Sequence, residues 1–564
     1  MHTSGTQIHP LHSIASHVHP IQSVHTKLHE VVSTQSAIRD IDAKDAANDT
    51  DLLAQIGYKQ ELKRSFHTYQ IFGIAYSIMG IVPSISSMTA TGLTAGPSGF
   101  VWAWFVAMHF IICISISMSE LASSIPTSGG LYFWTYYYAP ENYRVLFSYV
   151  IGLTNSMALC AGVVSVAYGN AEQILAAVYI QQDGNFEITS GKTYGIFAGC
   201  VITQCICTCF SSKSVATLQT ISSMLNTFLV VLIFIALPVG NSQKDFGFRS
   251  GEFIFGTVQN YSDWPIGFQF CLSLMTAVWS IGAFDSCVHM SEEAQNASFG
   301  VPIGILSSVS VVSYVSWFVI ICLVACMKPD VGAVLETGSG FPFAQIIYDA
   351  LGKKWTVAIM SLTAVGQWLC AASILTALSR QVWAFARDDG LPFSSIVKVV
   401  HPTLKVPIRA VLFATCVALA LGCLCLAGPA AANALFSLTV SGNYTAWCTP
   451  VLLRLTSGRS RFHPGPFYLG AFWSQIIGWI TCAWGGFILV LCMFPSVKSV
   501  DKTDMNYTCV ITGSVWIFAL VYFAVYKRKF YHGPKTNLGP EDGTEVDKIP
   551  ISLDSAIEST EKRE

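Results

Sequence analysis

Two interrupted apolar stretches hold the residues best suited to binding chemistry. The first, residues 71–92, is apolar enough to span a membrane but is interrupted at Gly80 and Pro83. Proline removes a helical hydrogen bond and glycine adds conformational freedom. A new helix after the break would begin with unpaired N–H groups, whose partial positive charge suits a carboxylate. Simple bending is the other interpretation of such a pair. Hydroxyl groups that could assist lie at Ser84, Ser86 and Ser87.

The second stretch, residues 279–286, places a carboxylate at membrane depth. An ionisable side chain there is costly, so Asp285 is a functional-site hypothesis for ligand or proton binding. It could instead cap a half-helix or hold a structural hydrogen bond. Trp279 could act as an aromatic gate or simply pack. Together the two stretches offer one end for an anion and one for a cation, as a zwitterion requires. The other residues that could line this pocket are Ser280, Gly282 and Phe284.

Other ionisable groups in apolar segments have simpler interpretations. Glu120 closes the second apolar segment, where a structural anchor is favoured over a functional role. Glu172, His109 and His289 are single groups that we expect to be satisfied by local hydrogen bonds.

Composition assigns the chain to a bilayer. It has 564 residues, of which 52% are hydrophobic and 11% charged, against about 25% charged in soluble domains. A formal net charge of −2 gives no indication of nucleic-acid binding. The cysteines, including the closely spaced group at 205–209, are expected to pack as small apolar residues. We expect no metal, cofactor or enzymatic chemistry, and no cleavable signal peptide.

The apolar segments and their flanking charges predict a topology. About twelve stretches are long enough to cross a bilayer. Lys and Arg are concentrated in alternate loops, for example residues 380–409 and 454–461, and the positive-inside rule then places both termini in the cytosol. The predicted stretches are 69–91, 99–122, 145–178, 192–211, 215–239, 267–289, 302–327, 355–380, 407–427, 430–454, 470–494 and 507–527.

The two interrupted stretches are the first and the sixth, so each opens a block of five helices. Because five is an odd number, the second block enters the membrane from the side opposite to the first. This arrangement predicts an inverted repeat with both breaks near the midplane of the membrane. The fold class is therefore an all-α membrane protein. The predicted segments are a disordered cytosolic tail (1–50), a basic pre-membrane segment (51–66), the first repeat (67–240), a non-cytosolic loop (241–266), the second repeat (267–455), two further helices (456–529) and a cytosolic tail (530–564).

Three longer motifs resemble a known superfamily. SELASSIPTSGGLYFW (119–134), DSCVHMSEEAQNA (285–297) and SRQVWAFARDDGLP (379–392) are similar to signatures of amino acid–polyamine–organocation transporters. The resemblance covers residues 51–538. It implies a LeuT-type fold and secondary active transport. Segments that narrow the resemblance to the fungal 4-aminobutyrate (GABA) permeases are 56–66, 131–143, 183–199 and 463–470.

The resemblance also implies a substrate and its contacts. The expected substrate is GABA, with putrescine or 5-aminolevulinate as possible extras and H⁺ as the coupling ion. In the family the first break binds the substrate carboxylate, and the sixth segment supplies the aromatic gate and the acidic residue, here Trp279 and Asp285. We add Ser77, from the segment before the first break, as a further candidate. The positions that match the first break are Met79, Gly80, Ile81 and Ser84.

One position departs from the family pattern. Some proton-coupled relatives carry a lysine in the fifth span, where this chain has Asn226. An amide does not exchange a proton near neutral pH. The expected proton carrier is therefore Asp285 or Glu120, and Asn226 could instead bridge helices.

Two alternatives remain at the level of sequence. One is a choline or polyamine permease of the same superfamily, and the other, less favoured, is a non-transporting nutrient receptor. The resemblance allows the vacuolar or the plasma membrane. Sequons at Asn260 and Asn506 lie on the predicted non-cytosolic side.

Overall fold

A computed structural model describes residues 49–51, 53–54, 58–62, 64, 66–210, 212–427, 429–498 and 505–535. Within these residues the chain is helical, apart from loops and one isolated parallel bridge between Phe66 and Ala294. The predicted tails, 1–50 and 530–564, lie outside the described residues except at 49–50 and 530–535.

The helices follow one another with short connections. Both predicted interruptions are visible as separate helices on either side of a gap. The bounds are α2 Thr68–Met79, α3 Ile81–Leu93, α4 Gly96–Ser124, α5 Gly130–Tyr138, α6 Arg144–Gln181, α7 Ser190–Thr208, α8 Ser212–Asn241, α9 Gly251–Phe255, α10 Ile266–Ser273, α11 Met275–Ser280, α12 Ser286–His289, α13 Ala297–Ala325, α14 Val331–Leu335, α15 Pro342–Leu351, α16 Lys353–Arg387, α17 Ser394–Val397, α18 Ile408–Gly422, α19 Pro429–Leu455, α20 Ala471–Leu491 and α21 Thr508–Val525.

Nine segments among the described residues are long and apolar enough to cross a membrane. The joined pair α2–α3 is one of them, and α10–α11 forms a shorter apolar helix of residues 266–280. Helices α7 and α19 also coincide with predicted stretches, but they carry buried amides such as Gln204 and Asn443 and are not among the nine. The short helices α5, α9, α14 and α15 were not predicted.

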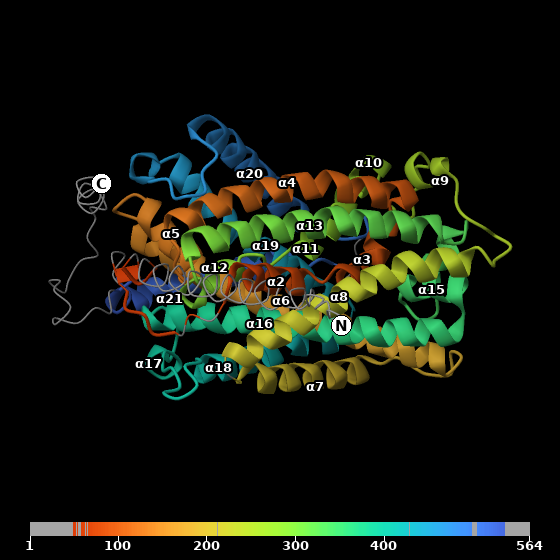
Figure 1. The fold of residues 1–564 in the computed structure, drawn as a ribbon, viewed down its shortest axis with the longest axis horizontal. Helices are drawn as coiled ribbons and strands as arrows, with labels where there is room; N and C mark the ends of the chain where they lie inside the picture. Colours follow the sequence, from red (N-terminus) through yellow and green to blue (C-terminus); the bar gives the residue numbers. More distant parts are fainter. Residues whose placement is uncertain are drawn as a thin grey trace, which may run out of the picture.

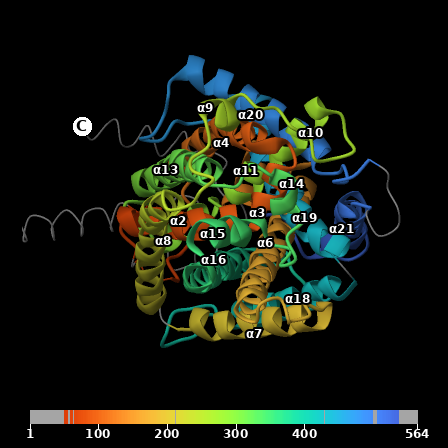
Figure 2. The same cartoon turned by 90° about the vertical axis from the view of Figure 1, so that its right-hand side faces the viewer.

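The long helices lie side by side along one axis of the molecule (Figure 1). One end holds residues 58–66, α5, α12, α17 and residues 526–535, and we call it the terminal face. The other end, which faces the viewer in Figure 2, holds α9, α14 and α15, and we call it the opposite face. Both ends of the described chain therefore meet on one face.

Burial separates central from peripheral helices. In the most apolar windows of α2–α3 and α6, 89% of residues are buried, against 33% in α8 and 22% in α21. Figure 2 accordingly shows α2, α3, α6, α11 and α16 surrounded by α4, α7, α8, α18, α20 and α21. Large exposed apolar side chains on the outer helices, such as Phe228 and Phe518, are suited to contact with lipid.

Candidate functional site

The first break is a single glycine. Gly80 joins α2 to α3 with φ +35° and ψ 89°. Its N–H donates to the Tyr76 carbonyl at 3.2 Å, and its carbonyl accepts from the Ser84 N–H at 2.8 Å. A β carbon at this position would lie 2.3 Å from Cys370 Sγ. Both the backbone conformation and the contact with α16 therefore require glycine.

The start of α3 leaves backbone donors unpaired. The N–H groups of Ile81 and Val82 belong to the first turn, which has no intrahelical acceptors. Pro83, the third residue, has no N–H and is tolerated in a first turn. The break therefore lies at Gly80, and Pro83 belongs to the new helix. Two N–H groups at the positive end of a helix form an anion-binding position.

The second break spans residues 281–285, between α11 and α12. The Ile281 N–H still donates to the Ala277 carbonyl at 2.8 Å, and then Ala283 adopts φ +55°, which is uncommon for a residue with a side chain. Asp285 precedes α12, but its side chain makes no capping hydrogen bond. The predicted capping alternative for Asp285 is not seen in this structure.

Asp285 is instead held by residues of other helices. Its side chain is fully buried, and Oδ2 accepts from Asn155 Nδ2 of α6 at 3.0 Å. His289 Nε2, one turn further along the chain, lies 3.4 Å from the same oxygen. Oδ1 has no hydrogen-bond partner. A buried carboxylate with one free oxygen can still accept a donor from a ligand.

The Asp285–His289 pair needs a shared proton. His289 Nδ1 lies 3.1 Å from the Ser128 carbonyl, which can only accept, so Nδ1 carries a hydrogen. In a neutral ring Nε2 would then present a lone pair to the carboxylate. A favourable contact therefore requires one proton on either Nε2 or Asp285. Of the two His289 nitrogens, only Nδ1 has the hydrogen-bond partner that we expected.

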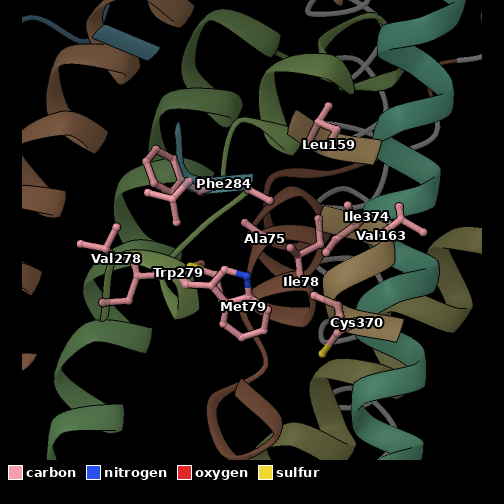
Figure 3. Close-up of a cluster of buried hydrophobic side chains, with 14 of the residues drawn as sticks. Ala75, Ile78, Met79, Leu159, Val163, Val278, Trp279, Phe284, Cys370 and Ile374 are labelled. Atoms are coloured by element: carbon pink, nitrogen blue, oxygen red, sulfur yellow. The ribbon is translucent and has the colours of Figure 1, made fainter. Parts of the chain in front are cut away.

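The two breaks face each other in the bundle centre. Helix α11 packs against α3, and α12 packs against α2 and α16. Figure 3 shows Trp279 beside Met79, with Phe284 across from Ala75 in the same buried cluster. Trp279 is 7% exposed and Met79 is 1% exposed. The side chains of Leu159 and Val163 on α6 and of Cys370 and Ile374 on α16 close the cluster.

Polar atoms without partners gather around this cluster. Besides Asp285 Oδ1, the hydroxyls of Thr276, Ser280 and Ser286 are buried and unpaired, and so is Asn226 Oδ1. Buried polar groups ordinarily have partners, so these atoms are available to a polar ligand that enters between the two breaks.

Several predicted site residues already make contacts within the protein. Ser84 Oγ donates to the Met79 carbonyl at 2.6 Å, so its hydrogen is already used. Ser77 bonds to Ser222 of α8 and lies 3.0 Å from Ser373 Oγ of α16, away from the second break. Gly282 is partly exposed, and the Phe284 ring packs on Trp447 with centroids 4.4 Å apart.

The hydroxyls at 86 and 87 point to α6 and not to the second break. Ser86 Oγ donates to the Pro83 carbonyl at 2.6 Å and accepts from Gln173 Nε2 at 2.8 Å. Ser87 Oγ donates to the same carbonyl at 3.3 Å. Serine in a helix commonly bonds back to the preceding turn, which explains this orientation.

Glu120 and Asn226 differ sharply in their surroundings. Glu120 Oε2 accepts from Arg454 and from Ser474 Oγ, both at 2.6 Å, and Oε1 accepts from the Leu469 N–H at 3.2 Å. This geometry favours the anchor role. Asn226 Nδ2 donates to the Ser222 carbonyl at 3.0 Å, while Oδ1 lies next to Gly80. Asn226 is thus beside the first break.

Two buried ion pairs close the terminal face below the site. Arg387 of α16 lies 3.1 Å from Glu292, and Arg380 lies 2.8 Å from Glu293. Both carboxylates follow α12, so these pairs tie the second break to α16. These four residues lie in two of the quoted motifs, 285–297 and 379–392, but their pairing as ion pairs was not predicted. The pairs join segments about 90 positions apart, a separation that sequence spacing does not reveal.

A second cluster joins both chain ends to α16. Asp388 accepts hydrogen bonds from Tyr58 at 3.1 Å and from Tyr132 at 2.7 Å, and the Lys535 N–H lies 3.3 Å away. Burial raises the pKa of Asp388 to about 6, against the opposing effects of Arg387 and of these hydrogen bonds. The first residues of the predicted C-terminal tail therefore pack on the bundle.

Comparison with known proteins agrees with this architecture. An amino acid permease family model matches residues 66–515. A GABA-specific permease of Saccharomyces cerevisiae is 57% identical over 508 residues, covering 90% of this chain and 89% of that protein. A putative polyamine transporter of Candida albicans is 31% identical, covering 92% of this chain and 96% of that protein. The chain belongs to the amino acid permease family and is a multi-pass membrane transporter, not an enzyme.

Proposed function

We propose that this chain carries 4-aminobutyrate across a membrane. The observation that carries the proposal is the pair of facing helix breaks, one with free N–H groups at Ile81 and Val82 and the other with the free oxygen of Asp285. A zwitterion matches both. The extent of identity to a GABA-specific permease, compared with 31% to a putative polyamine transporter, favours GABA over polyamines.

In this proposal the substrate carboxylate binds the start of α3 at Met79, Gly80, Ile81 and Val82. The ammonium group binds Asp285 Oδ1 and the free hydroxyl of Ser280, and Trp279 and Phe284 form apolar walls. Ser84 can donate to the carboxylate only when its hydroxyl rotates away from the Met79 carbonyl. Putrescine lacks a carboxylate and would leave the α3 donors unpaired, which is costly.

We further propose twelve spans with a LeuT-type inverted repeat and both termini in the cytosol. The broken helices α2–α3 and α10–α12 would be spans one and six. Buried ion pairs hold the terminal face closed, as expected of a carrier whose two faces open in turn. Substrate can shift this equilibrium only by binding one conformation more tightly.

Proton coupling is assigned to the Asp285–His289 pair. The pair lies at the second break and has one proton to share, and a substrate ammonium at Oδ1 would compete for the same negative charge. Substrate binding and proton binding would therefore be linked at one carboxylate. Glu120 is less suited, because its two oxygens already accept three hydrogen bonds.

The test is uptake of radiolabelled GABA into proteoliposomes under an imposed pH gradient. We expect accumulation that collapses when the gradient is dissipated, and strong competition by GABA analogues that keep both charges. Competition by choline or putrescine but not by ω-amino acids would favour the alternative permeases. Absence of uptake with retained binding would favour a receptor.

Variants at the pair test the coupling. Asp285→Asn is expected to abolish accumulation, and His289→Gln to weaken the pH dependence while leaving exchange of GABA across the membrane. Gradient-driven accumulation in Asp285→Asn at the wild-type rate would remove the pair from the mechanism.

A further inference from the structure

A cavity opens at the opposite face of the bundle, away from the two helix breaks. It has a volume of about 310 Å³. Its walls come from α6, from the loop that enters α7 and from the loop between α14 and α15, which contributes Ser339 and Phe341. Thr189, Ser190 and Thr193 also line the cavity. The cavity is of small-molecule size and has both polar and apolar walls.

The cavity holds an uncompensated carboxylate. Glu172 lines it and interacts with the Tyr168 hydroxyl one turn earlier on α6. Among the described residues, no Lys, Arg or His forms an ion pair with it, whereas the buried carboxylates Glu120, Glu292 and Glu293 each have an arginine. A carboxylate in a partly buried cavity stays charged at low cost only if a cation reaches it.

The floor of the cavity leads to the central site through aromatic rings. The Tyr168 ring lies 6.5 Å from that of Phe436 on α19, centroid to centroid. The Phe436 ring lies 4.9 Å from that of Trp279, which faces the first break. Two ring contacts therefore separate the cavity from the position proposed for the substrate.

We propose that this cavity is a capture site for the ammonium group of the substrate, with Glu172 as its anionic partner. The inference rests on the proposed function and adds a binding step before the Phe436–Trp279 contact opens. The ligand class is a small primary amine, with or without a distant carboxylate. Tyr168 and Phe341 also line the cavity, and aromatic rings attract cations. A ligand carrying only a carboxylate would be repelled by Glu172.

The test compares Glu172→Gln with Glu187→Gln. Both substitutions remove one negative charge near the same face, but Glu187 is exposed and does not line the cavity. For Glu172→Gln we expect the KM for GABA to rise about tenfold, because one charge-assisted contact is lost, while kcat stays nearly unchanged. We also expect inhibition of uptake by n-butylamine to disappear. Glu187→Gln should match the wild type, and Glu172→Asp should retain part of the amine inhibition.

Equal behaviour of the Gln variants, or a fall in kcat alone, would overturn the capture site. Failure of the wild-type protein to transport GABA would overturn the proposed function. The capture site could then still be tested by ligand-induced changes in thermal stability. In that case n-butylamine should raise the Tm of purified wild-type protein and leave the Tm of Glu172→Gln unchanged. A stabilising effect of the same size on both proteins would contradict the proposal.

Discussion

Substituting Gly80 by alanine tests the first break directly. Two costs add together at this position. The conformation at φ +35° costs a residue with a side chain about 1–3 kcal/mol, and the added β carbon would lie 2.3 Å from Cys370 Sγ, where ordinary contacts are 3.4–4 Å. The sulfur or the helix must therefore move by more than an ångström. We expect Gly80→Ala to lose transport almost entirely.

The two costs can be separated with Cys370→Ala. This second substitution removes the sulfur but not the backbone strain. The double variant should recover transport only partly, with a remaining loss of about 5- to 150-fold that corresponds to 1–3 kcal/mol. The assay is the initial rate of GABA uptake per folded transporter in proteoliposomes, with thermal stability measured in parallel. Gly195→Ala, with nothing within 4 Å of the new carbon, is the control.

Two results would refute this reasoning. Wild-type transport by Gly80→Ala would show that the break does not need glycine. A double variant no better than Gly80→Ala would show that the contact with Cys370 is not part of the cost.

Three further predictions concern the faces of the bundle. Burial raises the pKa of Asp388 to about 6 from an ordinary value of 3.8, so the folded protein binds a proton at Asp388 more tightly than the unfolded protein does. The resulting stabilisation of the fold is complete below about pH 4 and is lost as the pH rises through 6. The Tm of the wild type, measured relative to that of Asp388→Asn, should therefore rise when the pH is lowered from 7.5 to 5. An unchanged Tm difference would contradict the raised pKa of Asp388. Glu120→Ala should destabilise the fold by about 3–5 kcal/mol, because Arg454 is left buried without its partner. Folded Glu120→Ala should still accumulate GABA with a pH gradient, and specific loss of coupling would instead make Glu120 a proton carrier. A glycan removable by endoglycosidase is expected at the exposed Asn260 of the opposite face, and one at Asn296 would reverse the orientation.

The main features that sequence analysis predicted correctly have local causes. The break at Gly80 follows from a glycine near a proline inside an apolar stretch, and the break before Ser286 from Gly282 and a membrane-depth Asp285. Most helix ends lie close to the predicted ones because apolar runs are read along the chain. The exceptions are α13, which begins at Ala297 and not at 302, and α16, which continues to Arg387 and not to 380.

Other features depend on contacts between distant segments and were not visible in the sequence. The pairing of Glu292 with Arg387 requires that α16 return to the end of α12. The positive φ of Ala283 follows from the surrounding packing, since alanine has no preference for it. The cavity around Glu172 is likewise formed by segments that are far apart in the sequence. The contact of His289 Nδ1 with the Ser128 carbonyl likewise joins segments that are 161 positions apart.

The three quoted motifs meet in space at the terminal face. Ser128 and Tyr132 come from the first motif, Glu292 from the second, and Arg387 and Asp388 from the third. Tyr132 bonds to Asp388, and the Ser128 N–H lies 3.3 Å from Glu292 Oε1. The three motifs thus pack together around the end of α12.

The most direct test of the account is a structure determined with 4-aminobutyrate bound. We predict its carboxylate within hydrogen-bond distance of the Ile81 and Val82 N–H groups and its ammonium group at Asp285 Oδ1. A ligand bound elsewhere, or one whose carboxylate points away from the start of α3, would contradict the account.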